Sequence, residues 1–241
     1  MHWLKRYKFA RRLYHAEEIA MEPWGERLGY RYKKPRWAIL SALLDYVAHP
    51  CERINLHRAK SCKFGSLTKF LVIRLDHLGD LLCSFPAIRA LRNSYPNAYI
   101  SLLVGPWCIE LAQLNPHVDE IVVFRAPWFD RAMDRAKGIA VVAQLIAGAH
   151  ALRKRHFDCA LDMRGDLRNI MLMWLAHIPF RIGYDDVGGK FLLTHPIKRN
   201  RWQHETHRSM DVVRAIGCRA TDDKLRLRIP PKARYSIKHK L

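Results

Sequence analysis

The middle of the chain alternates short apolar runs with longer stretches of helical periodicity. This alternation is typical of β-α-β units, in which helices cover a parallel sheet. The predicted strands are 70–73, 99–104, 120–124, 157–161 and 180–184, and the predicted helices are 80–95, 109–114, 129–155, 167–177 and 204–216, the last closed by Gly217. The pattern predicts an α/β fold, a Rossmann-like parallel sheet with flanking helices.

The first 69 residues have a different character. They carry fifteen Lys and Arg against six Asp and Glu, a net charge of +9. Trp3, Tyr7, Ala10 and Tyr14 recur at helical spacing among basic residues, which predicts a basic amphipathic helix, and a second helix is expected over 37–48. We expect a mostly helical extension over 1–69, one domain over 70–217 and a basic tail over 218–241. The extension either contacts an anionic membrane or packs on the domain.

Composition and charge limit the classes of protein to which this chain can belong. Apolar residues make up 49% of the 241 residues, which suffices for a real core, and no apolar run approaches the roughly 20 residues of a spanning helix. The first residues lack the apolar stretch of a signal peptide, so a cytoplasmic address is expected. The net charge of +20 predicts an anionic partner: nucleic acid, an acidic membrane or an acidic substrate. Nucleic acid is disfavoured, because no recognition motif for it is evident.

The cysteines show no metal-binding spacing and are interpreted as reduced, buried thiols. They are Cys51, Cys62, Cys83, Cys108, Cys159 and Cys218.

The most informative local motif is the turn at 74–80, where the first predicted strand leads into the first helix of the predicted sheet domain. Ligands of open α/β sheets bind at this edge, and a helix N-terminus there favours anions. A single glycine gives little support for dinucleotide binding. Asp80 has two interpretations: a helix N-cap, or a general base, because an exposed aspartate is ionised at neutral pH. Arg74 at the strand end could pair with Asp76.

The chain resembles glycosyltransferase family 9, the heptosyltransferases of the lipopolysaccharide inner core. The resemblance rests on FLVIRLDHLGDLLCSFPAIRALRNSYPNAYISLLVGPWCIELAQLNPHVDEIVVF, then FDCALDMRGDLRNIMLMWLA, FRIGYDDVGG and HETHR, in this order over 70 to about 217. It implies the N-terminal, acceptor-binding half of a GT-B fold, and an inverting, metal-independent transfer from ADP-heptose with no cofactor. Asp80 falls on the position of the catalytic base. Arg74, His77 and Gly79 of the same turn are implied on the acceptor side.

Two further arginines are candidates for contact with an anionic acceptor. Arg164 and Arg181 are predicted near strand ends, where a guanidinium could bind a carboxylate or phosphate through two hydrogen bonds. Arg164 could equally pair with Asp162 or Asp166. His204, Glu205 and Arg208 are interpreted as the polar start of the last helix rather than as acceptor contacts.

The resemblance does not extend to the second domain, which holds the nucleotide-sugar donor in this family. The expectation is therefore a heptosyltransferase that is a fragment, depends on a partner or is inactive alone. Its partners would be an anionic lipopolysaccharide core acceptor and a nucleotide sugar, with a peripheral place on the inner membrane face. The alternative is a non-catalytic binding module for acidic glycolipid or an anionic membrane surface.

Overall fold

The structure is a computed structural model, and it describes residues 35–48, 50, 64–129, 139–200 and 202–228. The expected helix around Trp3, the expected extension up to residue 34 and most of the expected basic tail lie outside these residues. Of the extension, the described part includes α2 (Pro35–Val47), where the second helix was predicted.

Six parallel strands form one sheet, in the order β3-β2-β1-β4-β5-β6. They are β1 (Lys69–Arg74), β2 (Tyr99–Val104), β3 (Glu120–Val123), β4 (Cys159–Asp162), β5 (Phe180–Tyr184) and β6 (His195–Ile197). The α/β class and the parallel sheet are thus confirmed, and five of the strands lie where the apolar runs predicted them. The sixth, β6, was not predicted, because it is three residues long and contains Pro196, which an edge strand tolerates.

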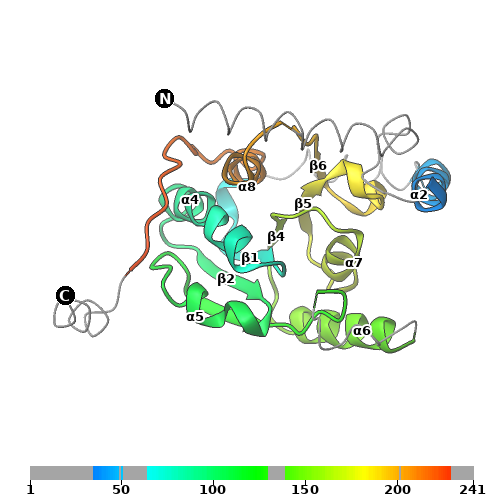
Figure 1. Cartoon of the computed structure of the whole chain (residues 1–241), viewed down its shortest axis with the longest axis horizontal. Coiled ribbons are helices and arrows are strands. Elements are labelled where there is room, and N and C mark those ends of the chain that lie inside the picture. Colours follow the sequence, from blue (N-terminus) through cyan, green and yellow to red (C-terminus); the bar gives the residue numbers. More distant parts are fainter. Residues whose placement is uncertain (1–34, 49, 51–63, 130–138, 201, 229–241) are drawn as a thin grey trace, which may run out of the picture.

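Helices cover both faces of the sheet, as Figure 1 shows. They are α4 (Leu78–Ser94), α5 (Ile109–Ala112), α6 (Ile139–Arg153), α7 (Leu167–Leu175) and α8 (Glu205–Arg214). α4 packs against α8 on one face, and α6 packs against α7 on the other. Of the predicted helix over 129–155, residues 130–138 lie outside the description, and Phe129 belongs to a turn closed on Ala126.

The core is two apolar layers separated by the sheet. Successive side chains of a strand point to opposite faces, so Phe70 and Val72 of β1 face α4 and α8, while Leu71 and Ile73 face α6 and α7. Arg74 continues the first of these series. Its fully buried side chain therefore emerges at the carboxyl end of β1 on the side of α4 and α8.

None of the helices in the described ranges is long and apolar enough to cross a membrane.

Candidate functional site

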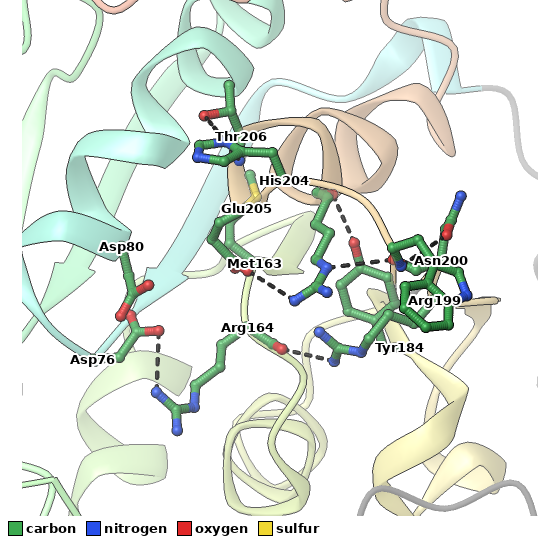
Figure 2. A network of polar contacts seen from close by, with 12 residues as sticks. Asp76, Asp80, Met163, Arg164, Tyr184, Arg199, Asn200, His204, Glu205 and Thr206 are labelled. Carbon is green, nitrogen blue, oxygen red and sulfur yellow. Dashed lines mark hydrogen bonds and ion pairs between the residues drawn. The ribbon is translucent and has the colours of Figure 1, made fainter. Parts of the chain in front are cut away.

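The candidate site lies at the carboxyl ends of β1 and β4, where the sequence placed it. β1 and β4 are hydrogen-bonded neighbours, with Ile73 opposite Asp162. The turns that follow the two strands therefore meet at one edge of the sheet. Asp76 lies in the turn after β1 and Asp80 in the first turn of α4 that follows it, while Arg164 lies in the turn after β4 (Figure 2).

Arg74 is the centre of the site. Its guanidinium donates from Nη1 to the carbonyl of Met163 at 2.7 Å and from Nη2 to Glu205 at 2.8 Å. Nε lies 3.0 Å from a carboxylate oxygen of Asp76, so the strand-end pairing considered from the sequence is present. Burial lowers the pKa of Arg74, but the carboxylates of Asp76 and Glu205 outweigh it and raise the pKa above its ordinary value. Arg74 is thus a permanently charged, buried cation.

Asp80 approaches the same guanidinium from α4. The helix begins at Leu78 with His77 as its N-cap, so Asp80 belongs to the first turn and the interpretation of Asp80 as the N-cap is wrong. A carboxylate in the first turn interacts favourably with the helix dipole. Its oxygen lies 3.7 Å from Nη2 of Arg74, and 36% of its side chain is exposed. Asp80 is therefore anchored on one side and open to solvent on the other.

Asp76 links the two turns. Its side chain is almost completely buried between Arg74 and Arg164, whose Nη1 donates to it at 3.1 Å. Burial raises the pKa of Asp76, although both arginines act in the opposite direction. Its main-chain carbonyl accepts a hydrogen bond from the indole of Trp107 at 2.7 Å, which fixes this part of the turn.

Arg164 is the most accessible of the three cations that the sequence proposed. Its partner is Asp76, while 32% of its side chain stays exposed and its guanidinium stacks 4.3 Å from the ring centroid of Phe129. From the sequence, Asp162 and Asp166 were the possible partners of Arg164. Asp162 instead accepts main-chain N–H groups of residues 164 and 166, and Asp166 pairs with Arg168.

Arg181 is not brought to this cluster. It is the second residue of β5, at the amino end of the strand, whereas the site lies at the carboxyl ends. Its guanidinium is buried and donates to the carbonyls of Ile178 and Leu192, both at 2.6 Å. Burial lowers the pKa of Arg181 to about 10. The expectation that Arg181 could bind the acceptor here is therefore wrong, because its donors serve the main chain.

His77 and Gly79 lie at the rim of the site. Both are exposed, and a Cβ on Gly79 would meet no atom within 4 Å. Together with Asp80 they belong to the solvent-accessible N-terminus of α4. The structure thus gathers five of the six residues that the sequence proposed.

Sequence reasoning undervalued Glu205 and missed Arg199. Glu205 is the first residue of α8 and forms ion pairs with Arg74 and Arg208. Burial alone would raise the pKa of Glu205, but the interaction with Arg74 outweighs burial and holds the pKa below its ordinary value. Arg199 donates to both carboxylate oxygens of Asp186 and to the carbonyl of Arg164 at 2.8 Å, and stacks on Tyr184 (Figure 2). The polar helix start HETHR signalled Glu205, but nothing local signalled Arg199.

The arrangement suits a reaction on a hydroxyl of an anionic molecule. Of the carboxylates around Arg74, Asp80 combines exposure with a position at a helix N-terminus, so it can accept a proton. Arg164 is the accessible cation beside it. Among the described residues, no three His, Cys, Asp or Glu side chains group as metal ligands.

A polar cavity of about 530 Å³ lies at the opposite edge of the sheet, where β1 and β2 begin. Its lining residues are Thr68, Lys69, Asn97, Tyr99, Glu120 and Arg155. It is separate from the Arg74 cluster.

Comparison with known proteins supports the resemblance found in the sequence. No family model matches the chain. Lipopolysaccharide heptosyltransferase 2 of Salmonella typhimurium is 27% identical over 116 residues, which are 48% of this chain and 31% of the relative. A putative glycosyltransferase of Haemophilus influenzae is 24% identical over 139 residues, 58% of this chain and 37% of the relative. The chain thus spans about a third of the length of these curated relatives.

Solved structures share the fold. A glycosyltransferase family 9 protein of Veillonella parvula superposes with a TM-score of 0.58 at 21% identity, covering 72% of this chain and 50% of that one. The ADP-heptose lipopolysaccharide heptosyltransferase II of E. coli gives 0.56 at 21% identity, with the same coverage. The resemblance to glycosyltransferase family 9 is confirmed by these relatives.

Proposed function

We propose that this chain, whose relatives over about half its length are lipopolysaccharide heptosyltransferases, provides the acceptor side of a glycosyltransferase of that type. The donor is a nucleotide sugar, ADP-heptose by analogy with the E. coli relative, and the acceptor is an anionic lipopolysaccharide core saccharide. The resemblance to family 9 implies that the donor is bound by a second domain.

One observation carries the proposal: the partly exposed carboxylate of Asp80 and the partly exposed guanidinium of Arg164 lie beside a buried ion pair. This buried pair is formed by Arg74 and Asp76, and each of the two exposed groups contacts one of its members. An acceptor phosphate or carboxylate would bind Arg164 through charge-assisted hydrogen bonds. This would bring a neighbouring sugar hydroxyl to Asp80.

In the proposed step Asp80 accepts the proton of the acceptor hydroxyl. The freed oxygen forms a bond to the anomeric carbon of the donor, and the bond from that carbon to the diphosphate oxygen breaks. ADP leaves with the electron pair, and the configuration at the anomeric carbon inverts. Arg74 does not touch the substrate in this scheme, because its side chain is fully buried and its two Nη atoms donate to Met163 and Glu205.

The test compares sugar transfer by the Asp80→Asn variant with transfer by the unaltered protein, both isolated from the cells that naturally make it. Asparagine keeps the shape of the side chain but cannot accept the proton, so sugar transfer should fall about a thousandfold. Acceptor binding, measured by calorimetry, should change little. The matched control is Asp223→Asn, since Asp223 is an exposed carboxylate paired with His207 rather than with Arg74.

Near-normal transfer by Asp80→Asn would remove Asp80 from the base role. An unaltered protein that binds the acceptor saccharide but transfers nothing when donor and a donor-binding domain are supplied would instead support the non-catalytic binding module.

A further inference from the structure

Arg199 is a buried arginine that connects the turns at the ends of three neighbouring strands. It follows the edge strand β6, and its side chain is 2% exposed. Its Nε donates to the carboxylate of Asp186, in the turn after β5, and its Nη2 donates to the carbonyl of Arg164, in the turn after β4, at 2.8 Å. The guanidinium lies 3.9 Å from the ring centroid of Tyr184, the last residue of β5 (Figure 2). One side chain thus reaches from the edge of the sheet across β5 to the candidate site.

The turn after β4 has room for this guanidinium because residue 165 is a glycine. Gly165 has a φ of +76°, and a Cβ at this position would overlap Nη2 of Arg199. Any other residue would therefore strain the backbone and also displace the guanidinium. The shape of the turn and the position of Arg199 depend on each other.

The main chain of this turn is held by buried side chains on both its N–H and its carbonyl groups. Asp162 accepts the N–H groups of residues 164 and 166 at 3.2 and 3.0 Å. Arg74 donates to the carbonyl just before Arg164 at 2.7 Å, and Arg199 donates to the carbonyl of Arg164 itself. The main chain sets the direction in which a side chain leaves it, so these contacts determine where the exposed guanidinium of Arg164 points.

We propose that Arg199 is a positioning residue of the acceptor site, which fixes the turn after β4 so that the guanidinium of Arg164 faces the acceptor. This inference rests on the proposed function, in which Arg164 binds the anionic group of the acceptor. Arg199 acts through Arg164, since a side chain that is 2% exposed does not reach the acceptor itself. A charged hydrogen bond depends on the direction of its donor, so a displaced turn weakens acceptor binding even where the charge of Arg164 is kept.

The experiment measures, by calorimetry on the full chain, the binding of a phosphorylated oligosaccharide prepared from the lipopolysaccharide core. Arg199→Lys keeps the charge but replaces the two donor nitrogens that serve Asp186 and Arg164 by a single one. The variant should raise the Kd about fivefold, because most of the contribution of a correctly directed Arg164 is lost.

The matched control is Arg181→Lys. It makes the same change at another buried arginine, whose Nε and Nη1 also donate to carbonyls, those of Leu192 and Ile178. Both variants should lose stability in a thermal melt. Arg181→Lys should nevertheless keep the Kd within about twofold of the unaltered value, because Arg181 lies at the other end of β5 and distant sites act independently.

A double-mutant cycle separates positioning of Arg164 from a general loss of order. Adding Arg199→Lys to Arg164→Gln should raise the Kd by less than about a further twofold, because the group that Arg199 positions is already absent. Independent effects would multiply instead. If Arg199→Lys does not fold, Asp186→Asn takes its place in the cycle, since it leaves the guanidinium of Arg199 intact but weakens its anchor.

Two results would overturn this inference and leave the proposed function intact. The first is a Kd for Arg199→Lys equal to that for Arg181→Lys. The second is a double variant in which the effects of Arg199→Lys and Arg164→Gln multiply. An unaltered protein that does not bind the oligosaccharide, or an Arg164→Gln variant that binds it as tightly as the unaltered protein, would instead contradict the proposed acceptor site and this inference with it.

Discussion

At the scale of single residues, Arg74 is the group on which the site depends. A charged side chain without exposure is costly unless its partners compensate the lost hydration. Arg74 has that compensation from a main-chain carbonyl and from the carboxylates of Asp76, Asp80 and Glu205. Removal of the cation would leave Asp76 buried with Arg164 as its remaining partner.

We expect Arg74→Met to lower the free energy of unfolding by about 3 kcal/mol or more, because it breaks a buried ion pair from one side. Arg74→Lys should lose less, since it keeps the charge but replaces the two donor nitrogens that serve Met163 and Glu205 by a single one. Urea unfolding at neutral pH measures both.

The control for this prediction is Arg226→Met. Arg226 is 64% exposed and pairs with Asp222 at the surface, so its loss should cost about 0.5 kcal/mol or less. Equal losses for Arg74→Met and Arg226→Met would contradict the structural role of Arg74.

Single residues also show what the sequence can and cannot predict about the site. Asp80 was predictable because a carboxylate just after a strand and a turn must lie at the ligand edge of the sheet. The partnership of Arg74 with Glu205 was not, because 131 residues separate the two and no local spacing relates them. Arg181 was misplaced for a similar reason: only the fold reveals that its neighbours are carbonyls at the other end of β5.

At the scale of elements, the predicted strands were found because each is a short, largely apolar run, as expected for strands of a parallel sheet. β6 lacked this signal, since the run His195–Ile197 is short and only partly buried. The first turn of α8 is the element that completes the site. His204 caps it by accepting the N–H of Thr206 at 3.3 Å, and Glu205 then reaches Arg74. The contact fixes the start of α8 to the end of β1.

The pH dependence of stability should reveal this contact. The pKa of Glu205 is lowered in the folded protein because Arg74 outweighs the effect of burial. A carboxyl group whose folded pKa is depressed stabilises the protein above its unfolded pKa, and this contribution is lost as the pH falls through the folded value. Glu205→Gln should therefore destabilise the protein at pH 7 but much less at about pH 3.

Urea unfolding at the two pH values measures the difference, with Glu110→Gln as the control, because Glu110 lies exposed on α5. The same loss of stability at both pH values would mean that the ionised carboxylate of Glu205 is not what ties α8 to β1.

At the scale of the whole molecule, the site and the net charge are separate features. The contacts around Arg74 join three guanidinium groups, on Arg74, Arg164 and Arg208, with three carboxylates, on Asp76, Asp80 and Glu205. These charges balance, so the excess of +20 resides elsewhere on the chain. Long-range attraction of an anionic acceptor and its local recognition at Arg164 should therefore respond differently to experiment.

We expect binding of an anionic core saccharide to weaken about tenfold or more when NaCl rises from about 50 mM to about 500 mM, because salt screens the attraction between separated charges. Arg164→Gln should weaken binding by about a further tenfold at every salt concentration, since it removes one charged hydrogen-bonding group. The salt dependence itself should be nearly unchanged, because one charge in +20 is lost. Calorimetric titration across salt measures both quantities, with Arg226→Gln as a control of equal charge. Binding that ignores salt, or an Arg164→Gln variant indistinguishable from Arg226→Gln, would contradict recognition of an anionic acceptor at Arg164.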